Sequence, residues 1–202
     1  MSNPGNGDAE YSLGCYASDM RFAFLLGFAT ITAGAANLDS LLDLAGNPVD
    51  PFASSRRVRV FLFVRTDCPI TNRYAPEVQR LYAEFSPRNA EFWLVYSDTR
   101  QSARDIVEHG KQYGFREKVL RDSRHLLARR AHATVAPEAA VFDGQGKLVY
   151  HGRIDDRYVD FGKSRAAPTR HDLEDAISAV LEGKPILEQA TQAIGCSLAD
   201  LE

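Results

Sequence analysis

The chain has few cysteines, no excess of positive charge and no long hydrophobic run. Its 202 residues include three cysteines, Cys15, Cys68 and Cys196, and a single tryptophan. The formal net charge is -3 with both signs scattered along the chain, so no basic surface is expected to follow a phosphate backbone. No Walker-type loop, internal repeat or Cys/His zinc spacing occurs. We therefore expect no nucleic-acid partner, no cofactor and no metal.

The longest apolar run is too short to cross a membrane. It extends over 12 residues, Phe22 to Ala33, whereas a spanning helix needs about 20. Arg21 precedes the run, and Ala33-Gly34-Ala35 has the small-x-small pattern of a cleavage site. These features predict a secretory signal peptide from Met20 to Ala35, and hence export to the periplasm or the extracellular space without a stable membrane span. The alternative is an ordinary buried N-terminal helix.

The remainder has the composition of one globular domain, with 45% hydrophobic and 25% charged residues over the whole chain. We expect three segments. Residues 1–36 hold a polar leader and the signal peptide, residues 37–183 form the folded domain, and residues 184–202 form a C-terminal tail that carries Cys196. Export would leave Cys68 and Cys196 in a compartment where disulfides persist.

Hydrophobic periodicity predicts alternating strands and helices in the folded domain. Strands joined by helical crossovers run parallel, and a hairpin adds antiparallel strands. The fold class expected is therefore α/β, with a central mixed β-sheet flanked by helices on both faces. The expected elements are a lead-in strand or hairpin (Leu41–Val49), two buried strands (Val58–Val64 and Glu91–Tyr96), helices (Pro69–Phe85, Ser102–Tyr113, Ser123–Ala133 and about His171–Leu181, the last with Thr169 as N-cap), a hairpin (Ala139–Asp143 with Leu148–His151) and a loop (Arg153–Pro168).

Cys68 lies at the junction of the first buried strand and the first long helix. Pro69 follows it at the first helical position, where a missing N–H costs nothing. Free backbone N–H groups and the positive end of the helix dipole stabilise a thiolate there, which lowers the thiol pKa and makes the sulfur reactive. Cys68 is therefore the candidate nucleophile.

The sequence after this cysteine resembles the active-site helix of the thioredoxin superfamily. Cys68-Pro69-Ile70-Thr71 followed by Ala75-Pro76 matches the pattern C-x-x-C-x-x-x-A-P, except that Thr71 stands at the second cysteine. Pro76 falls on the proline that kinks this helix in the family. The resemblance implies that Cys68 is the attacking thiol and that Thr71 hydrogen-bonds its thiolate.

A second segment, ATVAPEAAVFDGQGKLVYHG, resembles the region where the family has a cis-proline before a hairpin. The resemblance implies that Pro137 is this cis-proline and shapes the substrate surface beside the sulfur. It also implies that the Ala136 backbone is free to pair with a substrate strand. Together the two segments imply a thioredoxin-like fold over about Leu41 to Leu181.

Three departures distinguish this chain within the superfamily. The second cysteine is missing, and Asp67 replaces the usual tryptophan before Cys68, so its carboxylate should oppose the thiolate unless Arg65 or Arg73 offsets it. The peroxiredoxin pattern P-x-x-x-T-x-x-C is also absent, because Phe61 and Arg65 stand at its proline and threonine. The chain thus resembles a peroxiredoxin-like redoxin (AhpC/TSA-type) with a CxxT motif.

Cys196 is the remaining candidate for a resolving thiol. It could instead belong to a static disulfide, or the two thiols could lie far apart. The resemblance implies an exported thiol-disulfide oxidoreductase whose partners are protein thiols or disulfides, together with a reductant protein. One alternative is a thiol peroxidase acting on small hydroperoxides, in which oxidised Cys68 condenses with Cys196. Another is a non-enzymatic binding or metal-chaperone module.

Two further groups of residues have less specific patterns. The loop Arg153–Pro168 reads as solvated, and its length makes it the best candidate for partner specificity. The five histidines show no convergent ligand spacing, and most are expected at the surface or at helix caps. They are His109, His125, His132, His151 and His171.

Overall fold

The computed structural model describes residues 41–198. The predicted leader and signal peptide, residues 1–36, lie outside this range, so they stay predictions, as does export. Within residues 41–198, no helix has the length and hydrophobicity that crossing a bilayer requires.

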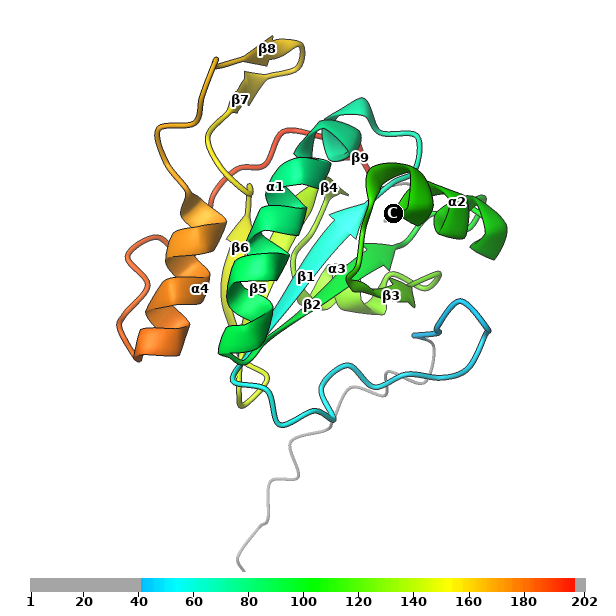
Figure 1. Cartoon of the computed structure of the whole chain (residues 1–202), viewed down its shortest axis with the longest axis horizontal. Helices are drawn as coiled ribbons and strands as arrows, with labels where there is room; N and C mark the ends of the chain where they lie inside the picture. Colours follow the sequence, from blue (N-terminus) through cyan, green and yellow to red (C-terminus); the bar gives the residue numbers. More distant parts are fainter. Residues whose placement is uncertain (1–40, 199–202) are drawn as a thin grey trace, which may run out of the picture. The chain divides into compact units, whose positions relative to one another are not determined.

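A five-stranded mixed sheet forms the centre of the domain, in the order β3-β2-β1-β5-β6 (Figure 1). Strands β1, β2 and β3 are parallel, and β5 and β6 are antiparallel to their neighbours. This confirms the predicted fold class. The strands are β1 (Val58–Val64), β2 (Ala90–Tyr96), β3 (Lys118–Arg121), β5 (Glu138–Asp143) and β6 (Leu148–Gly152).

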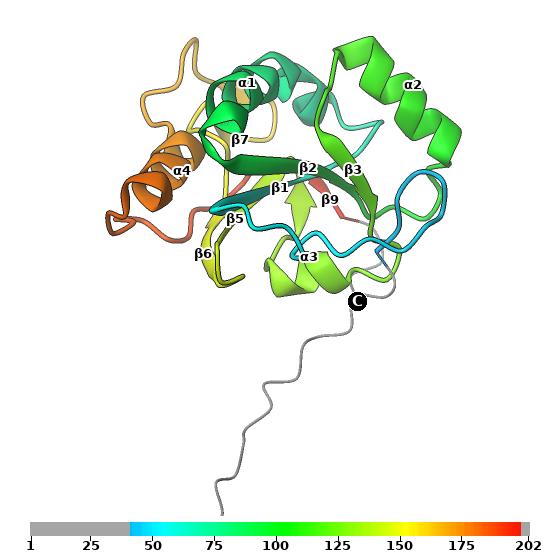
Figure 2. The same cartoon turned by 60° about the horizontal axis from the view of Figure 1, so that its bottom comes forward.

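Helices cover both faces of the sheet (Figure 2). On one face lie α1 (Pro69–Phe85), α2 (Ala103–Tyr113) and α4 (Asp172–Glu182). On the other lies the short helix α3 (Leu126–Arg130). A 3-10 turn, η1 (Ser86–Arg88), continues α1.

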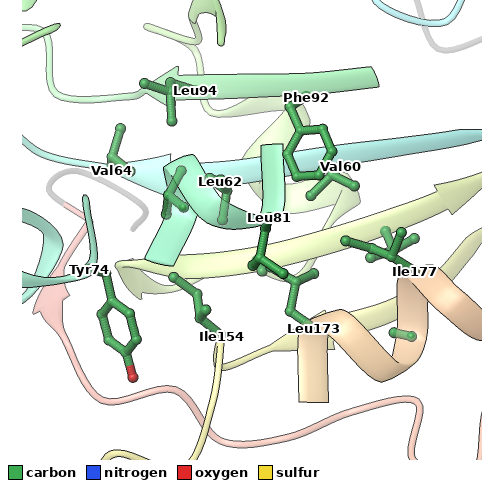
Figure 3. Close-up of a cluster of buried hydrophobic side chains, with 14 of the residues drawn as sticks. Val60, Leu62, Val64, Tyr74, Leu81, Phe92, Leu94, Ile154, Leu173 and Ile177 are labelled. Carbon is green, nitrogen blue, oxygen red and sulfur yellow. The ribbon is translucent and has the colours of Figure 1, made fainter. Parts of the chain in front are cut away.

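The alternation of side chains along β1 builds both cores. Val60 and Leu62 face α1 and α4, where they pack with Leu81 and other apolar side chains (Figure 3). Phe61 and Phe63 point to the opposite face and join the cluster around α3. Burial on both faces fixes β1 as the central strand, and so fixes the position of Cys68 just beyond its end.

Helix starts follow the sequence in one case and depart from it in another. At α2, a helix expected from Ser102, this residue is the N-cap and forms a capping box with Asp105. At α4 the prediction of Thr169 as N-cap is wrong, because His171 occupies that position. The backbone N–H and the hydroxyl of Thr169 both donate to the Asp156 carboxylate, each at 2.6 Å, so this side chain closes the preceding loop instead.

One bridged turn and two small pairs of strands complete the part of the domain that the structure describes. The predicted lead-in is a tight turn in which Leu42 bridges to Pro48 and to Arg121. The predicted loop Arg153–Pro168 contains a small hairpin, β7 (Tyr158–Asp160) with β8 (Lys163–Ser164), which projects from the body of the domain (Figure 1). The other pair, β4 (Val135–Ala136) with β9 (Cys196–Ser197), lies beside Cys68.

Candidate active site

Cys68 is the N-cap residue of α1, immediately after the turn that follows β1. Pro69 begins the helix as predicted, and Pro76 lies inside it. The Cys68 side chain has a relative exposure of 0%, so no part of its sulfur is open to solvent. The position at the N-terminus of a helix is the one that the sequence predicts for Cys68, whereas the complete enclosure of its sulfur is not predicted.

The tail brings the second cysteine into direct contact with the first. Both are free thiols, and their Sγ atoms are 2.6 Å apart, compared with about 2.05 Å in a disulfide. The alternative in which the two thiols lie far apart is therefore wrong. Only small movements separate this arrangement from a bond between Cys68 and Cys196.

The tail reaches the site by adding a strand to the proline loop. β9 pairs antiparallel with β4, which places Cys196 opposite Ala136 and Ser197 opposite Val135. The Ala136–Pro137 peptide bond is cis, in agreement with the geometry implied by the resemblance. The expectation that the Ala136 backbone is free for a substrate strand is wrong, because the chain's own tail occupies that place.

A second anchor holds the tail against β6. Ala190 bridges to His151, and the Thr191 hydroxyl accepts from the backbone N–H of Arg153 at 3.0 Å and lies 2.7 Å from the Tyr150 hydroxyl. Gly152, with φ +136°, makes room for this segment, because a Cβ there would collide with the backbone of Thr191. The tail is thus fixed to the fold upstream of β9 as well as within it.

The two thiols have opposite pKa shifts. Burial raises the pKa of Cys68, but the neighbouring Cys196 thiol and the backbone N–H and hydroxyl of Thr71 lower it, and the net pKa lies below the ordinary value. Burial and the Cys68 sulfur raise the pKa of Cys196 well above its ordinary value. Of the pair, Cys68 is therefore the one that ionises first, with Cys196 as the proton donor to its sulfur.

The Ala136 carbonyl favours the protonated form of Cys68. The protonated Cys68 thiol donates to this oxygen at 3.0 Å, a contact that is lost when the sulfur ionises. Thr71 is buried, and its hydroxyl satisfies hydrogen-bond geometry with no group among residues 41–198. The expected Thr71 hydrogen bond to the sulfur is therefore not formed in this arrangement, although the hydroxyl still favours the thiolate.

Arg65 neutralises the acidic residue next to the nucleophile. Its guanidinium makes a bidentate contact with Asp67, at 3.0 and 2.9 Å, and lies 3.2 Å from the buried carboxylate of Asp98. Its remaining amino group donates to the backbone carbonyl of Ser197 in β9 at 3.0 Å. Arg65, rather than the exposed Arg73, offsets Asp67, and it also holds the tail.

Sequence reasoning missed Asp98. It follows β2, whose end lies beside the end of β1 because the two strands are parallel. Hydrogen bonds from Arg100 and the charge of Arg65 lower the pKa of Asp98 to about 2, so the carboxylate stays ionised and orients Arg65. The signal available in the sequence was a charged residue just after the second buried strand.

A buried histidine links α1 to α2 behind the site. His109 lies between the Tyr96 hydroxyl, 2.8 Å from Nδ1, and the Asn72 side-chain oxygen, 2.8 Å from Nε2. Burial lowers the pKa of His109, which favours the neutral ring. His109 is thus a core residue, an exception to the expectation that most histidines lie at the surface or at helix caps, and it braces the first turn of α1.

Potential metal ligands gather away from the cysteines. Within residues 41–198, one set of side chains lies close enough to share an ion, namely Glu77, His171 and Glu174. Arg80 contacts both carboxylates, so their charge is already compensated by a guanidinium. This cluster gives no support for a metal centre.

Comparisons with known proteins identify the family and the fold. The model of the AhpC/TSA family matches residues 35–151, more than half of the chain. An uncharacterized conserved protein from Geobacillus kaustophilus is 25% identical, with a TM-score of 0.68 over 78% of this chain and 86% of that chain. A hypothetical protein from Sinorhizobium meliloti 1021 is 24% identical, with a TM-score of 0.67 over 78% and 88%.

A more distant match is a thiol:disulfide interchange protein of the thioredoxin family from Chlorobium tepidum TLS. It is 14% identical, with a TM-score of 0.51 over 69% of this chain and 90% of that chain. The comparison with curated proteins gives no match. The solved structures and the family model together show the thioredoxin-like fold.

Proposed function

This chain belongs to the AhpC/TSA family of thioredoxin-like redoxins, and from that premise we propose that it is a thiol-disulfide oxidoreductase with Cys68 as nucleophile and Cys196 as resolving thiol. The observation that carries the proposal is the 2.6 Å contact between the two sulfurs at the N-terminus of α1. Their opposite pKa shifts assign the roles, since the thiol that ionises first attacks first. Export, predicted from Met20–Ala35, is part of the proposal.

The reaction proceeds through two exchanges. The Cys68 thiolate attacks one sulfur of a substrate disulfide, which breaks the substrate S–S bond, forms a mixed disulfide and releases one substrate thiolate. Cys196 passes its proton to a departing thiolate and attacks the Cys68 sulfur, which forms the Cys68–Cys196 disulfide and releases the second substrate thiol. The substrate gains two electrons and the protein loses two, which an external dithiol reductant restores.

Two neighbouring residues assist the nucleophile in this scheme. Thr71 takes the place of the family's second cysteine. Its hydroxyl has no hydrogen-bond partner among residues 41–198 while Cys68 is protonated, and in this scheme it turns to the sulfur when Cys68 ionises, beside the Thr71 backbone N–H. Pro137 is cis and directs the Ala136 carbonyl toward the sulfur, so that β4 presents its backbone to a strand beside the reacting atoms.

The test compares two single-cysteine variants. The wild-type chain should accelerate reduction of insulin disulfides by dithiothreitol, and Cys68→Ser should abolish the acceleration. Cys196→Ser should accumulate a mixed disulfide at Cys68 that mass spectrometry detects, because the resolving step is missing. Full activity in Cys68→Ser, or no trapped adduct in Cys196→Ser, contradicts the proposal.

Membership of the AhpC/TSA family favours a thiol peroxidase as the second candidate. In that reaction the Cys68 thiolate attacks a hydroperoxide, releases an alcohol or water and becomes a sulfenic acid, which condenses with the Cys196 thiol to a disulfide and water. Consumption of hydrogen peroxide with a dithiol reductant, lost in Cys68→Ser, would identify this activity. Absence of peroxide consumption together with turnover of disulfides would select the oxidoreductase.

A further inference from the structure

The C-terminal strand lies where an extended substrate would meet Cys68. Its register places Cys196 opposite Ala136, and its sulfur 2.6 Å from the nucleophile. Any other strand that pairs with β4 in this register would present its own cysteine to Cys68 in the same way. The tail is therefore a guide to the segments that this surface accepts.

The residue before the cysteine has no space for a side chain. A Cβ at Gly195 would collide with the carbonyl of Ala136 and crowd the nitrogen of Pro137. These are backbone atoms held by the cis-proline loop and by β5, so they cannot rotate away as a flexible side chain would. The position before the cysteine is therefore restricted to glycine.

The positions after the cysteine differ in what they tolerate. Ser197 is exposed; its backbone carbonyl accepts from Arg65, and its hydroxyl donates only to the carbonyl of the neighbouring Leu198, at 3.3 Å. Leu198 is 2% exposed and joins the apolar cluster that contains Phe61 and Phe63, while its N–H donates to Thr134 at 2.9 Å. Any residue fits directly after the cysteine, and an apolar residue is favoured at the second position.

We propose that the surface formed by β4, Arg65 and the pocket now filled by Leu198 selects protein segments with the pattern Gly-Cys-x-apolar, whose cysteine is held in a disulfide. The inference rests on the proposed function, since Cys68 must exchange with that disulfide. In this exchange the Cys68 thiolate bonds to the sulfur of the substrate cysteine, and the other half of the disulfide leaves as a thiolate. The tail leaves its place to admit the segment and returns to let Cys196 resolve the product.

The tail competes with any added peptide for β4, and the experiment must reduce this competition. A tethered strand competes at an effective concentration in the millimolar range, so the tail must be weakened without deleting it. Gly195→Ala with Cys196→Ser introduces the collision with Ala136 and removes the competing thiol. Gly110→Ala with Cys196→Ser is the matched control, because a Cβ at Gly110 in α2 has nothing within 4 Å.

The probe is a peptide with the sequence of residues 192–198, QAIGCSL, its cysteine in a mixed disulfide with thionitrobenzoate. Attack by Cys68 releases the coloured thiolate, so the rate is read directly. Two comparison peptides carry alanine in place of the glycine or of the leucine. We expect each comparison peptide to react at least tenfold more slowly, and the parent peptide to react faster with the Gly195→Ala protein than with the control.

The outcomes separate this inference from the proposed function. Equal rates for the three peptides, within twofold, overturn the inference. Free dithionitrobenzoate reports on Cys68 without a peptide: if it labels Cys68 while the peptides react equally, only the inference fails, and if it leaves Cys68 unlabelled, the proposed function fails. Should circular dichroism show that the Gly195→Ala protein is unfolded, the same order of peptide rates must appear with Cys196→Ser alone at higher peptide concentration.

Discussion

At the scale of single residues, the reactivity of the site depends on one sulfur polarising the other. Cys68 is buried, and burial alone disfavours a thiolate. The Cys196 thiol offsets this by donating to the Cys68 sulfur, while its own proton is held more tightly. The nucleophile therefore owes part of its low pKa to a group that a later step consumes.

Removing this donor should raise the pKa of Cys68. In Cys196→Ala nothing replaces the thiol, so burial dominates and the pKa of Cys68 rises, whereas the hydroxyl in Cys196→Ser can still donate and keeps it lower. The measurement is the pH dependence of iodoacetamide alkylation of Cys68 in both variants, followed by mass spectrometry. Coincident pH profiles would show that Cys196 does not influence the thiolate.

Arg65 connects the charge of the site to the position of the tail. Arg65→Gln should release the Ser197 carbonyl and leave Asp67 without its counter-charge, so that β9 detaches more often. We expect alkylation of Cys68 to accelerate several-fold and the free energy of unfolding to fall by about 1–2 kcal/mol. Arg73→Gln is the control, because Arg73 is exposed and forms no ion pair within residues 41–198. Equal alkylation rates in the two variants would contradict this role.

At the scale of elements, the sequence predicted those whose hydrophobic pattern is long. β1, β2 and α1 were placed within one residue of their bounds because each buries a complete face or both faces. β3 was missed because it has four residues and only Leu120 is fully buried, which leaves no alternation to detect.

The residues of the candidate site differ in the same way, because some carry a local sequence pattern and others do not. Cys68, Thr71 and Pro137 carry a local motif and could be found from the sequence. The pairing of β9 with β4 could not, because two-residue strands separated by 59 positions along the chain have no local signal. The same holds for Gly152 and Gly195, whose need for a missing side chain arises only from the path of the tail.

The contact between Gly152 and Thr191, which holds the tail against β6, leads to a prediction about stability. Gly152→Ala combines an unfavourable φ of +136° with a collision against Thr191, so we expect a loss of about 3 kcal/mol in the free energy of unfolding. Gly162→Ala has φ +75° and open space, so it should cost only about 1 kcal/mol. Urea denaturation measures both, and faster hydrogen exchange of the tail in Gly152→Ala should accompany the loss. Equal costs would mean that this anchor contributes little.

At the scale of the whole molecule, the proposed cycle would close the chain into a loop in the oxidised state and open it in the reduced state. Cys68 and Cys196 are 128 positions apart, so their disulfide would connect the centre of the sheet to the C-terminal tail. Cys196 is partly exposed while Cys68 is enclosed, so a reductant that approaches the oxidised chain meets Cys196 first. In the proposed cycle, attack there would release Cys68 as the thiolate that starts the next round.

Closing so large a loop should stabilise the oxidised protein. The chain-entropy model gives about 5 kcal/mol for a loop of this length, and measured values are typically about 2–4 kcal/mol. At roughly 2–4 °C per kcal/mol for a domain of this size, the oxidised form should melt about 10 °C above the reduced form. Calorimetry of the wild-type chain with and without dithiothreitol measures the difference, and Cys196→Ser, which cannot close the loop, should melt at one temperature under both conditions. Mass spectrometry must first show that the protein without reductant is oxidised. If its melting temperature then equals that of the reduced protein, the disulfide adds no constraint to the unfolded chain and this prediction is wrong.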